Sequence, residues 1–379
     1  MRRTSRALVL VTTAWTLSLS MLGVRPVVAA SSDGFDSFIV SDDHATGPVY
    51  AEADDADSWS GNEPTPDAYE GLNSSNQVVD VMGGRRWDVM VDAMLLWQGN
   101  AQSLPLFLDS AGNVGLNAQD LQTDAGAGAR VGLIRRVNTS HAIEGNYFQA
   151  RPFNAEGKAP ESGGPYELTN TGDLTFNDIA KASVTSSGWI QSAELNWRKN
   201  ECWSPITWLA GFRWVELNSQ ANIDYEFENP DPFGTGNIDT NVGNNLYGGQ
   251  VGADMRLWNR GGNWRINGIG KAGIFYNSAS FQRSTAGFVT ATGDDYPLGT
   301  VAATADQTAF FGEVGLNSTY WITSWLAWRA GYTVMWAAGV AVAPEQFPLN
   351  NFGGTEPTSI NTNGSVLLHG VTTGIEARW

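Results

Sequence analysis

The feature that most limits the possible folds of this chain is an alternation of apolar and polar residues with a period of two. Between residues 264 and 277, one parity carries Trp264, Ile266 and Tyr276, and the other carries Arg265 and Lys271. Successive side chains of a β-strand point to opposite faces, so this pattern predicts a strand with one apolar face and one polar face. The same texture recurs along most of the chain after residue 85.

Ten such runs predict ten strands. Several approach twenty residues, well above the usual strand length of about five or six. A tilted strand needs only about 9–11 residues to cross the hydrocarbon of a bilayer, so the excess is expected to project beyond it. The runs are 86–98, 127–136, 140–151, 184–199, 206–222, 241–259, 263–284, 303–321, 324–342 and 364–379.

The connections between these runs alternate between long and short. Long ones cover residues 100–126, 152–183, 223–240, 285–302 and 343–363, and the intervening ones are as short as residues 322–323. Outer-membrane barrels have short periplasmic turns and long extracellular loops, and an even strand number returns both ends to one side. The chain is therefore predicted to be all-β, a transmembrane antiparallel up-and-down barrel with about ten strands over residues 86–379.

Tryptophan is abundant, at 16 residues, and most of it falls near the predicted short-turn ends of the strands. Indole rings favour the membrane interface, where one edge is apolar and the other is wet. The candidate interface girdle consists of Trp87, Trp197, Trp208, Trp258, Trp264, Trp321, Trp325 and Trp379.

Residues 1–30 are predicted to be a signal peptide. Arg2, Arg3 and Arg6 precede an apolar stretch, and Val28-Ala29-Ala30 offers small residues for cleavage. No second apolar run of about 18 residues follows, which argues against a helical membrane protein. The expected destination is the outer membrane of a Gram-negative cell.

Residues 31–85 form an acidic segment with twelve Asp or Glu, and no Lys or Arg lies between residues 31 and 84. A flexible arm is the favoured interpretation, over a calcium site at residues 54–57, because Trp59 stands where an EF-hand needs an oxygen ligand. The whole chain has a net charge of −17, and without residues 1–30 it keeps 18 basic and 39 acidic residues. This acidity excludes nucleic acid as an expected partner and favours cations.

Several short stretches resemble the planctomycete family of BBP-type outer-membrane β-barrel proteins. They are residues 93–97 (AMLLW), 208–214 (WLAGFRW), 244–250 (NNLYGGQ) and the closing run 366–379. The resemblance covers roughly residues 87–379, and it implies a fold and a location much more than an activity. The closing run alternates from Val371 to Trp379, which suggests the barrel-insertion machinery as a partner besides the lipid bilayer.

Charged residues within the strands are expected to face the lumen, because a charge on the lipid face costs about 2–4 kcal/mol at mid-bilayer. Two interpretations remain open: a narrow porin-like channel for small ions or solutes, or a packed lumen in a structural surface component. The modest strand number favours a packed or narrow lumen. The candidate lumen-lining residues are Glu194, Arg213, Asp254, Arg256, Arg265, Lys271, Glu313, Arg329, Glu376 and Arg378.

Catalysis finds little support in the sequence. None of the three His has a Ser and an acid at a recognisable spacing, and Asp294-Asp295 is more typical of a solvated loop. Gly268, Gly270 and Gly273 match a dinucleotide-binding pattern, but they lie inside a strand with no helix after them. No enzyme activity, cofactor or metal is expected. A secreted soluble β-sandwich that binds a ligand is the alternative, and a barrel hydrolase is the least favoured.

Overall fold

The computed structural model describes residues 86–99, 103–121, 123–160, 164–168, 179–200, 204–227, 235–259, 262–286, 300–349 and 360–379. The predicted signal peptide and acidic segment lie outside these residues, as do His44, Cys202 and the pair Asp294-Asp295. Within the described ranges, no helix is both long enough and apolar enough to cross a membrane.

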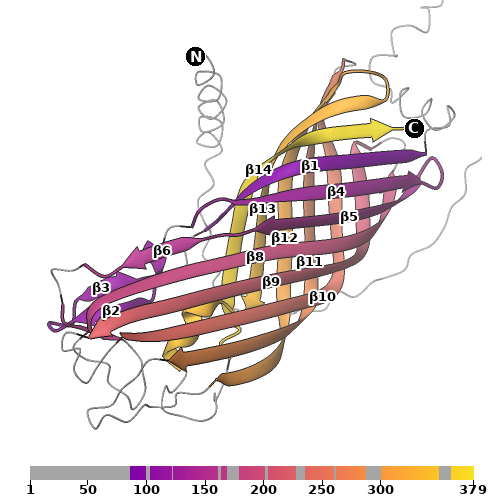
Figure 1. Ribbon diagram of the computed structural model, residues 1–379. Helices are drawn as coiled ribbons and strands as arrows, with labels where there is room; N and C mark the ends of the chain where they lie inside the picture. Colours follow the sequence, from indigo (N-terminus) through magenta and orange to yellow (C-terminus); the bar gives the residue numbers. More distant parts are fainter. Residues whose placement is uncertain are drawn as a thin grey trace, which may run out of the picture. The chain divides into compact units, whose positions relative to one another are not determined.

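Ten long strands pair side by side into a closed antiparallel ring, as Figure 1 shows. Each strand pairs with two neighbours in the order β1, β4, β5, β8, β9, β10, β11, β12, β13, β14 and back to β1. The all-β barrel of ten strands predicted from the sequence is confirmed. The bounds are β1 (Trp87–Gln98), β4 (Gly126–Arg136), β5 (His141–Arg151), β8 (Ile179–Asn200), β9 (Ile206–Phe227), β10 (Thr235–Asn259), β11 (Trp264–Ala286), β12 (Val301–Trp321), β13 (Leu326–Val340) and β14 (Gly364–Arg378).

The first and last strands close the ring. Their register runs without interruption from the pair Asp88 and Arg378 to the pair Gln98 and Leu368. At one end the backbone N–H of Trp87 donates to the Trp379 carbonyl at 2.9 Å, and the N–H of Trp379 donates to the Trp87 carbonyl at 3.1 Å. This end also carries the brief connections between strands, and we call it the short-turn end; the opposite end is the long-loop end.

The long connections contain structure that the sequence did not predict. They supply β2 (Pro105–Asp109), β3 (Val114–Asn117), β6 (Ala155–Lys158) and β7 (Tyr166–Leu168), with the short 3₁₀ helices η3 (Ala118–Asp120) and η4 (Ala343–Leu349). Strands β6 and β7 pair with the outer part of β8, and β2 bridges β7 and β3. The buried side chains of Phe107 and Tyr166 join those of Ile223 and Ile238 in an apolar core at the long-loop end.

The two faces of the strands exchange polarity along their length. In β9, near the short-turn end, Trp208 and Phe212 point outward, each 52% exposed, and Arg213 points inward, 1% exposed. Further along the same strand the outward positions are Asn218 and Gln220. The inward positions there are apolar, as the fully buried Ile223 shows. Only the part near the short-turn end therefore has the apolar exterior that lipid requires.

Aromatic side chains bound this apolar exterior on both sides. Trp87 and Trp97 lie on the outer face of β1 ten residues apart, and Trp328 and Trp336 lie eight apart on β13. Between Trp87 and Trp97 the outward positions of β1 are aliphatic (Val89, Val91, Ala93 and Leu95), and the outward Ile274 of β11 is 70% exposed. The spacing agrees with the 9–11 residues that a tilted strand needs to cross the hydrocarbon.

Candidate functional site in the barrel lumen

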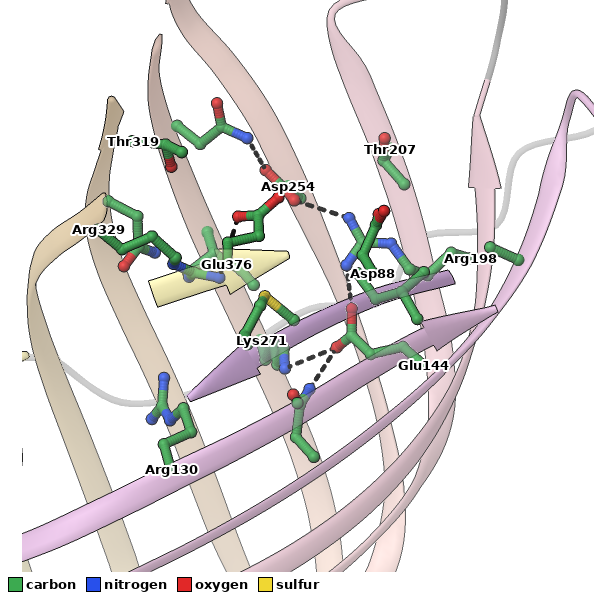
Figure 2. Close-up of a pocket in the computed structure, with 18 of the residues that line it drawn as sticks. Asp88, Arg130, Glu144, Arg198, Thr207, Asp254, Lys271, Thr319, Arg329 and Glu376 are labelled. Carbon is green, nitrogen blue, oxygen red and sulfur yellow. Dashed lines mark hydrogen bonds and ion pairs between the residues drawn. The ribbon is translucent and has the colours of Figure 1, made fainter. Parts of the chain in front are cut away.

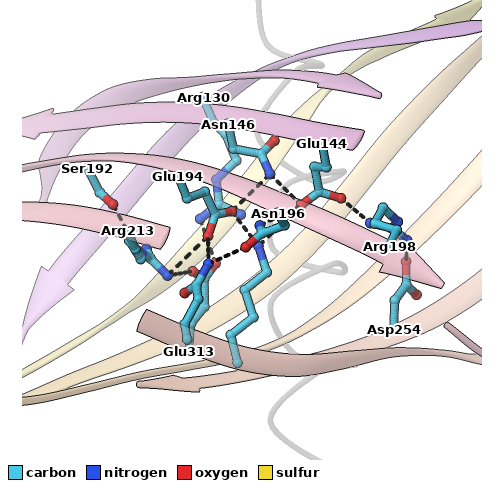
Figure 3. Close-up of polar contacts among 12 residues, drawn as sticks. Arg130, Glu144, Asn146, Ser192, Glu194, Asn196, Arg198, Arg213, Asp254 and Glu313 are labelled. Atoms are coloured by element: carbon cyan, nitrogen blue, oxygen red, sulfur yellow. Dashed lines mark hydrogen bonds and ion pairs between the residues drawn. The ribbon is translucent and has the colours of Figure 1, made fainter. Parts of the chain in front are cut away.

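The centre of the lumen holds a buried carboxylate between two guanidinium groups (Figure 3). Glu313 of β12 accepts hydrogen bonds from Arg130 of β4 at 2.8 Å and from Arg213 of β9 at 2.9 Å. Arg213 also donates to Ser192 at 2.8 Å and lies over the ring of Phe311, 4.5 Å from its centroid. Buried charges are tolerated when they are paired and hydrogen-bonded, and this group meets both conditions.

A second group of charges extends this network toward the short-turn end. The Lys271 ammonium contacts Glu194, and it lies 3.5 Å from Glu144. Glu144 also pairs with Arg198, which bridges to Asp254 at 2.7 Å. These residues belong to four different strands, and several of their ion pairs join strands that are not neighbours in the ring, such as β5 and β11, across the interior of the barrel.

A third group lies against the seam between β1 and β14. Asp88 pairs with Arg136 at 2.7 Å and with Arg378 at 3.4 Å. Glu376 pairs with Arg378 at 2.8 Å and with Arg329 at 3.4 Å. The strands that close the ring are thus also tied together through side chains on its inner surface.

All ten lumen-lining candidates from the sequence line one cavity of about 180 Å³, part of which Figure 2 shows. The cavity is also lined by Arg136 and Arg198, which sequence reasoning left out. Both point inward by parity: Arg136 lies six positions after Arg130 on β4, and Arg198 lies four positions after Glu194 on β8. The predicted strands 127–136 and 184–199 contain both residues, so their parity would have identified them.

An apolar layer lies above the charged groups, toward the long-loop end. It is formed by inward side chains of nine of the ten strands, together with Phe153 and Val342. Its large members include Phe148, Leu246, Phe275 and Phe311, each at most 3% exposed. These residues share the inward parity of the charges, a signal present in the sequence that sequence reasoning did not use.

The first part of the connection between β13 and β14, residues 341–349, folds inward and crosses the lumen above this layer. Gly339, with a φ of +78°, lies at a register shift in β13, and it turns the chain so that Val340 is buried. The following backbone is held by a strand three places away in the ring: Asn244 of β10 accepts from the N–H of Ala341 at 2.7 Å and donates to its carbonyl at 2.8 Å. Arg283 of β11 donates to the Gln346 carbonyl at 3.1 Å.

Seven of the eight girdle candidates lie on the outer surface or in a short turn, and six of them are at least 37% exposed. Trp87 and Trp325 illustrate the two placements, one at the start of β1 and the other in the turn before β13. Trp321 is the exception. It has the inward parity of Glu313 and Thr319, and the Arg378 guanidinium lies 4.2 Å from its ring centroid. The prediction of Trp321 as an interface residue was wrong, because parity places it in the lumen mouth, where it stacks with arginine.

The two described histidines lie on the outer face of the barrel. His141 accepts a hydrogen bond from the Trp197 indole at 3.1 Å, and the His369 Nδ1 lies 2.8 Å from the Tyr332 hydroxyl. Neither belongs to the charged network of the lumen.

The closed ring, its apolar exterior between aromatic belts and its charged interior define an outer-membrane β-barrel protein. The chain belongs to the family described as "Putative beta barrel porin-7 (BBP7)", whose model matches residues 97–379, well over half of the sequence. This match confirms the resemblance to BBP-type barrels and the location in the outer membrane. No curated protein matches the sequence.

The solved structures to which the chain is similar include the following three outer-membrane proteins, all at low identity. The outer membrane protease OmpT from Escherichia coli is 10% identical with a TM-score of 0.46, covering 78% of this chain and 97% of that one. The toluene transporter TodX from P. putida is 10% identical with a TM-score of 0.31, over 80% and 92% of the two chains. Neisserial surface protein A is 11% identical with a TM-score of 0.21, over 77% and 97%.

Proposed function

We propose that this protein is a closed outer-membrane barrel that acts as a structural surface component and does not conduct in the conformation described. The apolar layer carries this proposal. Phe148, Phe275 and Phe311 enter it from three different strands, and a dry apolar constriction opposes the passage of ions and polar solutes. The inward loop held by Asn244 adds a second barrier above it.

The location and orientation of the barrel complete the proposal. Residues 1–30 direct export, the short-turn end faces the periplasm, and the long-loop end extends from the cell surface. The insertion machinery recognises the β14 strand, and the chain has no enzyme activity. N-terminal sequencing of the mature protein and protease digestion of intact cells test export and orientation: a start at residue 31 and surface cleavage within the long loops are expected.

A narrow channel is the second candidate, favoured by the family description and by the cavity in the charged half of the lumen. Planar-bilayer recordings of the purified full-length protein separate the two. If the barrel is closed, the wild type should show no stepwise conductance. The triple variant Phe148→Ala, Phe275→Ala and Phe311→Ala should conduct. Alanine replacement of three outward residues, Val251, Ile274 and Val314, is the matched control. Regular conductance of the wild type would establish the channel instead.

A further inference from the structure

The charge of the cavity lining is opposite in sign to that of the whole chain. The chain has a net charge of −17, but the described residues that line the cavity include nine basic side chains and only seven acidic ones. The acids are Asp88, Asp92, Glu144, Glu194, Asp254, Glu313 and Glu376; the bases are Arg130, Arg136, Arg198, Arg213, Arg256, Arg265, Lys271, Arg329 and Arg378. Two positive charges are therefore in excess inside an acidic protein.

The excess can be assigned to particular residues. Seven of the nine bases have a carboxylate within 4.0 Å. Arg256 of β10 and Arg265 of β11 have no such partner among the described residues. Both lie close to the short-turn end of the cavity, on paired strands.

Within the part of the chain that the structure describes, the acids around Arg265 are already paired. Asp254 and Glu376 attract its guanidinium, and Arg256 and Arg378 repel it. Asp254 is already bound by Arg198 at 2.7 Å and by the Asn267 amide at 3.1 Å.

The second nearby acid is occupied as well, since Glu376 is bound by Arg378 at 2.8 Å. The buried Nε of Arg265 has no hydrogen-bond partner within the described part of the chain. Two of these arginines meet at Trp321, whose ring centroid lies 4.2 Å from the Arg378 guanidinium and 5.9 Å from that of Arg265.

We propose that Arg256, Arg265 and Arg378 form a binding site for a small oxyanion, a phosphate or a carboxylate, at the short-turn mouth of the lumen. Partly buried charges require compensation, and the planar guanidinium offers paired N–H donors that match two oxygens of such an anion. The cavity has room for it, since 180 Å³ corresponds to about six water molecules at ~30 Å³ each. The site is independent of whether the barrel conducts.

Equilibrium dialysis with inorganic phosphate, on the full-length protein folded in neutral detergent, tests the site. We expect saturable binding by the wild type and at least a tenfold loss in the double variant Arg256→Gln with Arg265→Gln. The matched control is Arg135→Gln, which removes an outward-facing arginine near the same end of the barrel and should leave binding unchanged. Competition by acetate would distinguish a site for carboxylates from one that accepts phosphate alone.

Denaturation provides a second measurement that a purely structural arginine pair would not reproduce. Because only the folded state has the site, phosphate should raise the urea midpoint of the wild type and leave that of the double variant unmoved. In phosphate-free buffer the double variant should be at least as stable as the wild type, because the removed charges have no carboxylate within 4.0 Å among the described residues. A wild type without saturable phosphate binding, or a double variant that binds equally well, would overturn the proposal. If the double variant does not fold, Arg265→Lys should still weaken binding, because lysine keeps the positive charge but lacks the paired N–H donors of the guanidinium.

Discussion

Replacing Glu313 by Gln is expected to be among the most destabilising conservative changes in the lumen. The side chain is 4% exposed and is the shared partner of Arg130 and Arg213. Glutamine keeps the shape but leaves two guanidinium groups facing a neutral amide. Removing one partner of a buried ion pair costs about 3–5 kcal/mol. Of its contacts with carboxylates, Arg213 retains only the longer one to Glu194, at 3.7 Å, so little of this cost is recovered.

The assay is urea unfolding of the protein in lipid vesicles, followed by tryptophan fluorescence and by the mobility of unheated samples on SDS gels. Glu226→Gln is the matched control, because Glu226 pairs with Lys181 at 3.2 Å on the exposed surface, where such a pair contributes at most about 1 kcal/mol. Adding Arg130→Gln to Glu313→Gln should restore part of the lost stability, since it rebalances the charge. If Glu313→Gln cost no more than Glu226→Gln, the interpretation of the network as a structural core would be wrong.

Three further outcomes are expected. In a Cys202→Ser background, Ile274→Cys should react with a lipid-phase maleimide and Phe275→Cys should not; the opposite result would reverse the assignment of the two faces. Asn244→Ala should loosen the loop that crosses the lumen and increase hydrogen exchange at residues 341–346, with Asn218→Ala on the outer face as control. Burial raises the pKa of Glu345 in η4, so the folded loop favours the protonated carboxyl. The loop should therefore be most stable below about pH 4.5, the ordinary pKa of Glu, and should lose this stability as the pH rises through the raised pKa of Glu345. Hydrogen-exchange rates of the loop, corrected for their intrinsic pH dependence, should show this trend. Glu345→Gln should abolish it.

Most of the barrel could be predicted from the sequence, because its strands obey a rule that acts residue by residue. A strand between lipid and a polar lumen must alternate, and one residue of slip would turn every side chain to the wrong face. Trp264 and Lys271 therefore indicate their faces without any knowledge of the partner strands. The small strands of the long loops could not be found in this way. β2 and β7 are five and three residues long, and their pairing depends on contacts that the local sequence does not encode.

The interior was predicted less well than the wall, for a physical reason. Parity shows that Glu313 and Phe311 point inward, but not what each meets there, because the lumen brings together residues from strands far apart in the chain. The contact between Glu313 and Arg130 joins positions 183 residues apart. Trp321 is a second example. Its residue type suggested the membrane interface, but its parity points it into the lumen, where β11 and β14 bring arginines close to it.

The exchange of polarity along the strands explains why this barrel closes where it does. Inside the membrane the exterior must be apolar, so the remaining polar residues face inward and must pair with each other, as Lys271 and Glu194 do. Beyond the membrane the exterior meets water, and the alternation of β9 carries Asn218 outward and Ile223 inward. A polar lumen and an apolar core therefore meet within one barrel, and the boundary between them is the apolar layer around Phe275 and Phe311. The lumen is therefore closed because the strands are longer than the membrane is thick. Shortening β9 and β10 together, by the same even number of residues at their long-loop ends, should weaken the apolar layer. It should preserve the register of the membrane-spanning part.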